Sequence, residues 1–431
     1  MSPTHTADAG LKILTSPPVF DSLYAFCSPG DLCRVAKTCN GASQAVTNYV
    51  THRFTIDLSR LLLRFFASQE DVLEFRRLQA KHQFLISGSA ALQLLDRTIY
   101  PDSDLDLYLF PNDAEAVGRW LIGRGYEFSP DVRGGQTFEE AVKFAKLDRE
   151  HDDRYEDSEY ALPGVRDVLS FTKLIDRTPR WPGQPSLSHI LEDKFTEIQL
   201  IVSDVTPYEA ILKFHSTVVM NVVTWDRAIA LFPLGTLDQR RGIKTLLTNW
   251  TFEEAVDKYR RRGFSFLQPY ARFDEGFKRA FKFGHRFFGD EHSWVIRLDT
   301  TGIDPPEMSV AVEGNSWELD YDNYDNYFVI ETESRKFDLV ETHHEYCVGE
   351  AFAAYIDRLI MSVRTVNEEN LDRYIQFFNQ DPDQPLARRT TGKAGDSIII
   401  GGNDVQMFNI LLRHFRDLDE VDELAEWLKD L

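Results

Sequence analysis

Residues 83–110 read QFLISGSAALQLLDRTIYPDSDLDLYLF, and this stretch decides the fold. The apolar residues at 84–86 predict a short buried strand, and Ser87-Gly88-Ser89 predicts a turn that opens a helix. After Pro101, a second strand is predicted over 102–110. This order of strand, turn, helix and strand predicts an α+β domain.

The second strand is acidic on one face. Alternate side chains of a strand share a face, so Asp102, Asp104 and Asp106 point one way while Leu105 and Leu107 point to the core. Two carboxylates about 4 Å apart repel by about 4 kcal/mol at an effective dielectric near 20. A divalent cation removes that cost, and oxygen ligands suit Mg2+ or Mn2+. The alternative is a half-buried strand with a solvated acidic face.

The glycine turn adds a place for phosphate. Gly88 allows close approach of a ligand to the backbone, and Ser89 opens a helix whose free N–H groups attract anions. With 14 residues between Ser89 and Asp104, the arrangement resembles the nucleotidyltransferase fold of the polymerase-β-like superfamily. The resemblance implies a mixed sheet with flanking helices. It also implies that Gly88 and Ser89 bind a nucleoside triphosphate, while Asp104 and Asp106 serve as catalytic and metal-binding residues for Mg2+ (or Mn2+).

The same family places a third carboxylate on a later strand, between two apolar residues. In Thr196-Glu197-Ile198-Gln199-Leu200 the residue so flanked is Gln199, an amide that takes no proton at neutral pH. Either Glu197, on the same face, substitutes as a catalytic residue, or the site binds nucleotide and metal without efficient transfer. A carboxylate within metal-bridging distance of both aspartates would favour an enzyme. Gln199 in that position would favour a degenerate recognition domain.

The N-terminal helices provide the second hypothesis. Helical patterns are predicted on either side of Ser28-Pro29, with Asp31 capping the second. The residues that carry a resemblance to the F-box are Pro17-Pro18, Phe26, Ser28-Pro29, Asp31-Leu32, Val35 and Cys39. That resemblance implies docking of a Skp1-like ubiquitin-ligase subunit through residues 15–55, which would make the chain an adaptor. The alternative is a helical extension that packs on the following domain.

The two modules together resemble a family of fungal F-box-like proteins with a nucleotidyltransferase-like domain, for which no activity is established. The resemblance extends over residues 15–295 and includes Phe214-His215-Ser216-Thr217, Met220-Asn221 and Lys258-Tyr259. The resemblance supports the order of the two modules along the chain, but it implies no particular reaction.

Other chemical groups have two interpretations each. His215 and Ser216, expected after a strand, would face the nucleotide or cap the backbone. Four basic residues, Lys258, Arg260, Arg261 and Arg262, would hold phosphate or form a solvated helix end. A zinc site at His343, His344, Glu345 and Cys347 is weighed against a surface strand, which is favoured because the two histidines fall on opposite faces. Core packing is expected for Cys27, Cys33 and Cys39.

The domain organisation is inferred from changes in pattern. The expected units are an F-box-like module at 12–57, a connecting helix at 58–82, a nucleotidyltransferase-like domain at 83–235, a helical extension at 236–298 and a mixed α/β region at 299–431. Residues 129–165 are charged and poorly periodic, so a solvated insertion is expected there. An amphipathic helix is expected over 405–430.

Composition limits the partners and the location. The chain has 431 residues, with 69 Asp and Glu against 48 Lys and Arg, for a net charge of −21. This acidity disfavours general nucleic-acid binding, although a local basic patch leaves that partner open. Four cysteines are too few for a disulfide framework and indicate a reducing compartment. With no signal-peptide pattern and no apolar run long enough for a membrane, a cytoplasmic or nuclear protein is expected.

Overall fold

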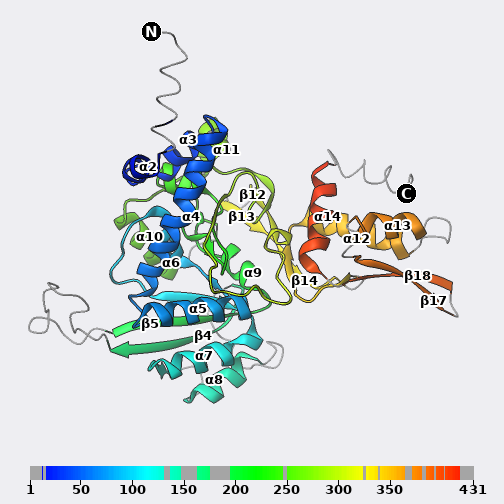
Figure 1. Cartoon of the computed structure of the whole chain (residues 1–431), viewed down its shortest axis with the longest axis horizontal. Helices are drawn as coiled ribbons and strands as arrows, with labels where there is room; N and C mark the ends of the chain where they lie inside the picture. Colours follow the sequence, from blue (N-terminus) through cyan, green and yellow to red (C-terminus); the bar gives the residue numbers. More distant parts are fainter. Residues whose placement is uncertain are drawn as a thin grey trace, which may run out of the picture.

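The computed structural model extends over the chain and is drawn in Figure 1. The residues that it describes are 12, 16–130, 136–146, 163–174, 195–245, 250–323, 327–337, 340–364, 371–380, 385–392, 395–401 and 403–417.

Helices form the N-terminal part. These are α2 (Pro17–Tyr24), α3 (Pro29–Ala36), α4 (Asn40–Leu62) and α5 (Gln69–His82). A capping box starts α3, because the Ser28 side chain accepts from the Asp31 N–H while the Asp31 carboxylate accepts from the Ser28 N–H. Both α2 and α3 pack on the long helix α4, and the rings of Tyr24 and Tyr49 meet edge to face. Helix α4 runs without interruption through residue 57, where the first two predicted units were divided.

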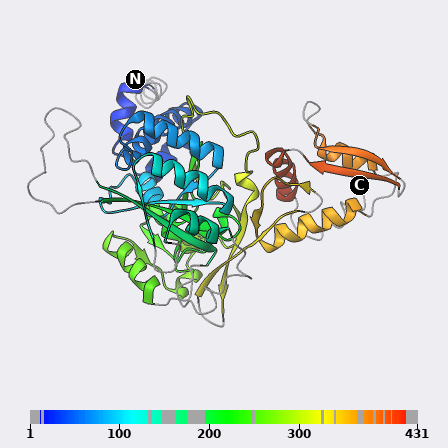
Figure 2. The same cartoon turned by 90° about the horizontal axis from the view of Figure 1, so that it is seen from below.

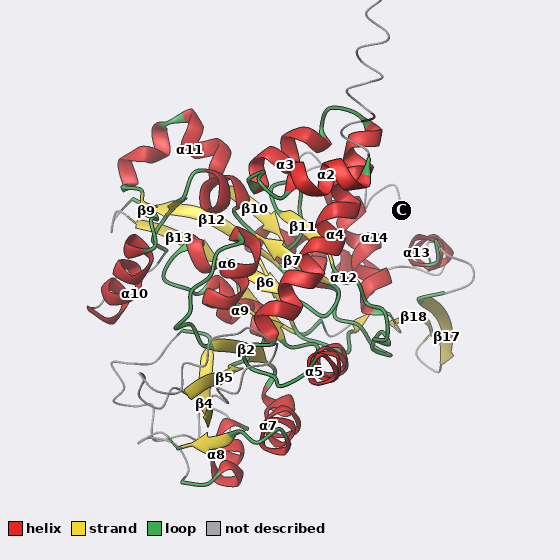
Figure 3. Cartoon of the chain, turned by 60° about the vertical axis from the view of Figure 1, so that its left-hand side comes forward, coloured by secondary structure: helices red, strands yellow, loops and turns green. Residues whose placement is uncertain are grey.

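An eight-stranded mixed sheet forms the centre of the molecule (Figure 3). Its order is β11 (Trp294–Arg297), β7 (Arg227–Ala230), β6 (Asn221–Val223), β1 (Leu85–Ile86), β2 (Leu105–Leu109), β5 (Phe195–Ser203), β4 (Val165–Leu174) and β3 (Glu127–Ser129). Only β2 and β5 run parallel, and each other described neighbour pair is antiparallel.

Helices and short turns connect these strands. The helices are α6 (Gly88–Asp96), α7 (Ala114–Gly123), α8 (Phe138–Ala145), α9 (Pro207–Leu212), α10 (Trp250–Arg261) and α11 (Glu275–Ala280). The shorter elements are η1 (Pro111–Asp113), η4 (Thr217–Val219), η5 (Leu234–Asp238), η6 (Pro269–Phe273), η7 (Val312–Gly314) and the strand pair β8 (Arg241–Gly242) and β9 (Ser265–Phe266).

The two faces of the sheet pack into different cores. On β2, Leu105, Leu107 and Leu109 join the core that also contains the N-terminal helices, whereas Tyr108 joins the core that extends into the C-terminal part. This alternation follows from the two-residue period of a strand. Asp106 therefore lies on the Tyr108 face, opposite to the face that the N-terminal helices cover.

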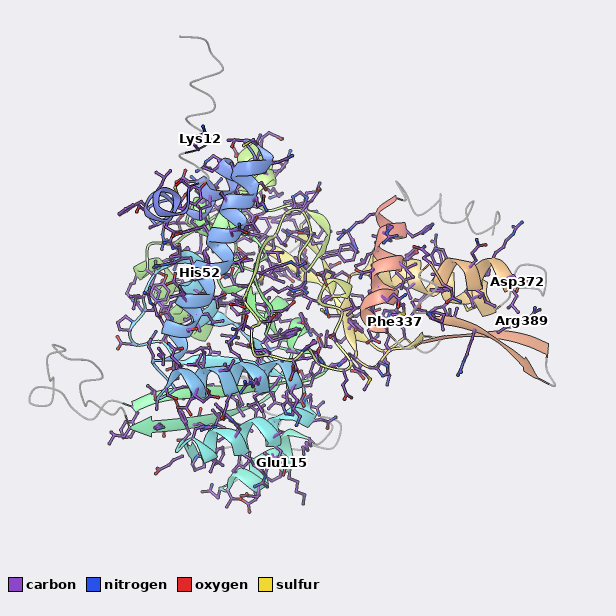
Figure 4. The ribbon with its side chains drawn as sticks, in the orientation of Figure 1. Lys12, His52, Glu115, Phe337, Asp372 and Arg389 are labelled. Carbon is purple, nitrogen blue, oxygen red and sulfur yellow. The ribbon has the colours of Figure 1, made fainter. Side chains whose placement is uncertain are left out.

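The described residues of the C-terminal part form three small sheets and three α-helices. The sheets are formed by β10 (Gly284–Phe287), β12 (Ser316–Asp322) and β13 (Tyr327–Glu331), by β14 (Glu333–Arg335) and β16 (Tyr346–Val348), and by β15 (Val340–Glu341), β18 (Gly395–Gly401) and β17 (Ala387–Gly392). The helices are α12 (Glu350–Arg364), α13 (Leu371–Phe378) and α14 (Asp404–Asp417). Helices α12 to α14 with β17 and β18 project to one side of the body in both Figure 1 and Figure 2. At the far end, Arg389 on β17 lies 3.7 Å from Asp372 on α13 (Figure 4).

The prediction of an α+β chain with a mixed sheet and flanking helices is confirmed. Several local predictions differ from the structure. Strand β2 begins at Leu105, so Asp102 lies outside it and Asp104 directly precedes it. Helix α8 lies inside the segment expected to be an insertion, where Thr137 and Glu140 form a capping box. The expected helical extension also contains strands, of which β11 joins the main sheet.

The last predicted helix is α14, which begins at Asp404 and ends at Asp417, and positions 418–430 of that prediction lie outside the described residues. Among the described residues, no helix combines the length and the apolar composition needed to cross a membrane.

Candidate functional site

Four polar side chains meet on one face of the parallel strand pair. Gln199 of β5 pairs with Asp106 of β2, and Leu105 pairs with Ile198. One step earlier along the two chains come Asp104 and Glu197. All four polar side chains are partly exposed, while the residues between them are buried. The sequence prediction that these residues share one face is therefore consistent with the pairing of β2 and β5.

The two aspartates repel each other and their neighbour. Burial and, after it, the negative charge of Asp104 raise the pKa of Asp106 to about 7, while Lys258 opposes the shift. Burial also raises the pKa of Asp104, followed by the charge of Glu197, with Lys258 and Arg64 acting in the opposite direction. A bound cation would stabilise the ionised form of these carboxylates, because it would replace the solvation that burial removes.

Gly88 lies directly against Asp106. Its φ of +62° falls in the left-handed region, and a Cβ built on it would lie 2.6 Å from Oδ2 of Asp106. Both the backbone and the space therefore require glycine here. Helix α6 starts at this residue, and Ser87, which precedes it, uses its hydroxyl to donate to the carbonyl of Asn221 rather than to cap the helix. The first N–H groups of α6 consequently start beside the Asp106 carboxylate.

Ser89 is held by residues from a distant segment. Its Oγ shares a hydrogen bond of 2.8 Å with the hydroxyl of Tyr259 on α10, and Nη1 of Arg262 donates to the same Oγ at 3.0 Å. The guanidinium of Arg262 also lies over the ring of Tyr100, 3.8 Å from its centroid. Burial raises the pKa of Tyr259 to about 12, so its phenol stays protonated at neutral pH.

The basic residues in the last turn of α10 and directly after it divide into two groups. Lys258 is exposed, yet its charge lowers the pKa of both Asp104 and Asp106, which places it beside the carboxylates. Arg262 reaches Ser89. Arg260 and Arg261 are exposed, and Arg260 pairs with Asp257, as the interpretation of a solvated helix end requires. A solvated helix end therefore fits the exposed Lys258, Arg260 and Arg261 but not Arg262, which donates to Ser89.

His215 and Ser216 lie at the edge of the same site. They follow helix α9 and not a strand, in contrast to the sequence prediction. The ring of His215 packs edge-on against Tyr259, with 5.8 Å between centroids, and burial lowers its pKa to about 4. Among the described residues, neither Nδ1 of His215 nor Oγ of Ser216 has a hydrogen-bond partner.

An amide lies where the resemblance noted in the sequence led us to expect a third carboxylate. Nε2 of Gln199 donates to Oε1 of Glu197 at 3.0 Å, so Gln199 faces Asp106 and also holds the nearest glutamate. Within the part of the chain that the structure describes, no three His, Cys, Asp or Glu side chains are gathered closely enough to hold a metal ion by themselves. The two aspartates would need further ligands, such as phosphate oxygens or water.

The other metal and cysteine candidates have structural roles. The backbone N–H groups of His343 and His344 donate to the Asp404 carboxylate, and Cys347 is buried on β16. Cys39 is exposed and accepts from the Ala42 N–H at the start of α4, so the expectation of core packing is wrong for that residue.

Sequence reasoning missed Tyr259, Tyr100 and Arg64 as neighbours of the site. Tyr259 was noted only as part of a resemblance, because an aromatic residue on a helix is usually core. No family model, curated protein or solved structure matches this chain significantly. The residues described above are therefore the basis for any functional conclusion.

Proposed function

We propose that this chain binds a nucleoside triphosphate together with Mg2+ (or Mn2+), with Gly88 and Ser89 at the phosphates and Asp104 and Asp106 at the metal. The observation that carries the proposal is the contact of Gly88 with Asp106. It brings the N–H groups at the start of α6 next to a carboxylate, without a side chain between them. A helix N-terminus attracts phosphate, and a carboxylate pair attracts a divalent cation.

The charges around the site support the same ligand. Lys258 and Arg262 bring positive charge to an otherwise acidic chain, and Arg262 already touches Ser89. Burial and the charge of Asp104 raise the pKa of Asp106, so a bound cation would stabilise the ionised carboxylate. These oxygen donors fit a hard divalent cation, which would neutralise them and the triphosphate when bound.

A nucleotidyltransferase-like fold is part of this proposal. It is supported by the order β1, α6, β2 and by β5 beside β2 with polar residues on one face. In nucleotidyl transfer, an acceptor oxygen attacks the α-phosphorus, pyrophosphate leaves, and the acceptor proton needs a base. Glu197 would take that proton. Its Oε1 already accepts a hydrogen bond from Gln199, so slow transfer or binding alone is expected.

The test is a thermal shift with each nucleoside triphosphate in the presence and absence of MgCl2. A ligand at about 100 times its Kd stabilises the folded state by about 2.7 kcal/mol, so the wild-type Tm should rise by a few degrees. The Asp104→Asn, Asp106→Asn variant should lose the shift. As a control, Asp21→Asn with Asp304→Asn removes two exposed carboxylates elsewhere and should keep it. An unchanged shift in the Asp104/Asp106 variant would refute the proposed site. Release of pyrophosphate, assayed in parallel, reports transfer.

A second function is favoured by two specific observations. Gln199 takes the position of the third carboxylate, and Phe26, between α2 and α3, is 92% exposed. An F-box-like adaptor that docks a Skp1-like subunit through residues 15–55 would cover that ring. In this case the sheet domain would serve recognition.

Binding to a purified Skp1-like subunit tests the adaptor. Phe26→Ala should abolish binding with little change in Tm, because the ring makes few contacts within the chain. Phe273→Ala removes another ring, 71% exposed, from a distant segment and should keep binding. Equal binding by the Phe26→Ala variant and the wild type would exclude docking through this loop.

A further inference from the structure

A pocket lined by four arginines lies between α4 and the end of α6. Its volume is about 280 Å3, and Arg53, Arg60, Arg64 and Arg97 line it together with one acid, Asp57. Three positive charges are therefore in excess around one small cavity of a chain whose net charge is −21. We call this cavity the arginine pocket.

Two of the arginines share the only acidic lining residue. Asp57 accepts from Nε of Arg53 at 2.9 Å and from Nη1 of Arg60 at 3.2 Å. The side chains of these arginines are 35% and 62% exposed. A guanidinium has five N–H donors, so each retains donors that Asp57 does not use.

The other two arginines are held by neutral groups. Nη2 of Arg64 donates to the carbonyl of Pro101 at 2.8 Å, and Nη2 of Arg97 donates to the carbonyl of Ala25 at 3.1 Å. Carbonyl oxygens orient a guanidinium but do not cancel its charge. Burial lowers the pKa of Arg64, and the charges of Asp102 and Asp104, which do not line the pocket, oppose that shift. The pocket lining contains four guanidinium groups and one carboxylate, that of Asp57, so an anion bound there would meet an excess of positive charge.

Apolar side chains complete the lining. Leu61 and Leu94 are buried beside the arginines, and Ile99 is 81% exposed. The volume lies just below the range of about 300–1,000 Å3 that is usual for ligand pockets, so a small molecule fits and a polymer segment does not. Guanidinium groups bind phosphate through two parallel hydrogen bonds.

We propose that the arginine pocket binds a small organic phosphate monoester, with its phosphate on the arginines and its organic part on Leu61, Leu94 and Ile99. The excess of three charges matches a phosphate dianion better than a single carboxylate. This site is distinct from the one at Asp104 and Asp106. The two sites are joined by Gln93, which lines the pocket and donates from Nε2 to the carbonyl of Ser89 at 3.2 Å.

Calorimetric titration with phenyl phosphate and with inorganic phosphate tests the proposal. The full chain should bind phenyl phosphate more tightly than inorganic phosphate, and added salt should weaken both. The Arg53→Gln, Arg60→Gln variant should bind phenyl phosphate at least ten times more weakly. Arg119→Gln is the matched control, because Arg119 is an exposed, ion-paired arginine on α7. Its partner Glu115 lies far from His52 of α4 in Figure 4. This control should bind like the wild type.

Two further variants distinguish binding in the arginine pocket from binding at the nucleotide site and test the contacts with the organic part of the ligand. Asp104→Asn with Asp106→Asn should keep phenyl phosphate binding, so a failure of nucleotide binding would leave this result intact. Ile99→Ser should weaken binding of phenyl phosphate and leave inorganic phosphate unchanged. The proposal is overturned if phenyl phosphate does not bind at millimolar concentration, or if the Arg53/Arg60 variant, with a wild-type Tm, binds it as tightly as the wild type. If the wild type binds phenyl phosphate and inorganic phosphate equally tightly, the apolar residues do not contact the organic part of the ligand, and that part of the proposal is overturned.

Discussion

Gln199 lies opposite Asp106 in the parallel pairing of β2 with β5, and it donates a hydrogen bond to Glu197 on its own strand. The amide of Gln199 adds no charge beside its two acidic neighbours, Asp106 and Glu197. A carboxylate there would complete a set of acidic side chains on one face.

The first prediction concerns this amide. Gln199→Glu should lower the Tm in the absence of metal, because it adds a like charge beside Asp106 and removes the hydrogen bond to Glu197. Mg2+ should restore the lost stability by binding the enlarged carboxylate set. Gln199→Met is the matched control, since it loses the hydrogen bond without adding charge. If Mg2+ raises the Tm of both variants equally, the carboxylate added at position 199 does not bind the metal.

The second prediction concerns Gly88. Gly88→Ala should destabilise the chain by roughly 1–3 kcal/mol in urea unfolding, since φ is +62° and the new Cβ would lie 2.6 Å from the Asp106 carboxylate. Gly123→Ala provides the comparison. No atom lies within 4 Å of a Cβ at that helical glycine, so alanine should be neutral or stabilise by about 0.5–1 kcal/mol. Similar effects at both positions would contradict a tight contact at Gly88.

The third prediction separates two adjacent arginines. Arg262→Gln should weaken nucleoside triphosphate binding about tenfold, or about 1.4 kcal/mol, because Arg262 donates to Ser89 and lies over Tyr100. Arg261→Gln changes the charge by the same amount at an exposed neighbour and should have little effect. The affinities of both variants are measured by titration at one salt concentration. If both lose the same amount of affinity for the nucleotide, the effect comes from the total charge and not from the contact with Ser89.

The fourth prediction uses the buried imidazole of His215. Its pKa is about 4 in the folded chain because burial disfavours the charged ring, against about 6.5 when unfolded. The unfolded chain binds more protons between these values. Stability from His215 is therefore fully present above pH 6.5 and falls as the pH drops toward 4, by up to about 3 kcal/mol.

Unfolding free energies of the wild type and of His215→Gln, measured from pH 7.5 to 4.5, provide the test. The wild type should lose more stability than the variant as the pH falls, because all other acidic groups are common to both. His52→Gln removes an exposed histidine on α4 and should follow the wild-type curve (Figure 4). Parallel curves for the wild type and His215→Gln would show that His215 charges freely in the folded chain.

Sequence reasoning works for relationships between neighbouring residues. The spacing of Gly88, Ser89 and Asp106 predicted a turn before a helix and an acid on the following strand, and both are present, whereas Asp104 directly precedes that strand. The shared face of Glu197 and Gln199 also follows from the strand period. These relationships depend on backbone geometry within a few residues.

Contacts between distant segments were not predictable in this way. Tyr259 reaches Ser89 across 170 residues and Arg262 reaches it across 173, and no periodicity of α10 indicates which helix end meets α6. The start of β2 was also misplaced, because Pro101 and the following residues form a turn in which the Pro101 carbonyl accepts from Arg64. Tertiary hydrogen bonds decide both features.

The continuous course of α4 has a consequence for how this chain can be cut or recombined. Tyr24 and Leu32 of the first helices belong to the same buried cluster as Leu107 and Leu200 of the central sheet. The N-terminal helices are therefore not a cassette that can be removed or transplanted as a unit. A truncation before residue 57 would expose the interior of the sheet domain, so an adaptor role has to be tested with single surface substitutions. If these helices were exchanged for those of another protein, the surface of the sheet domain that packs against them would have to be exchanged as well.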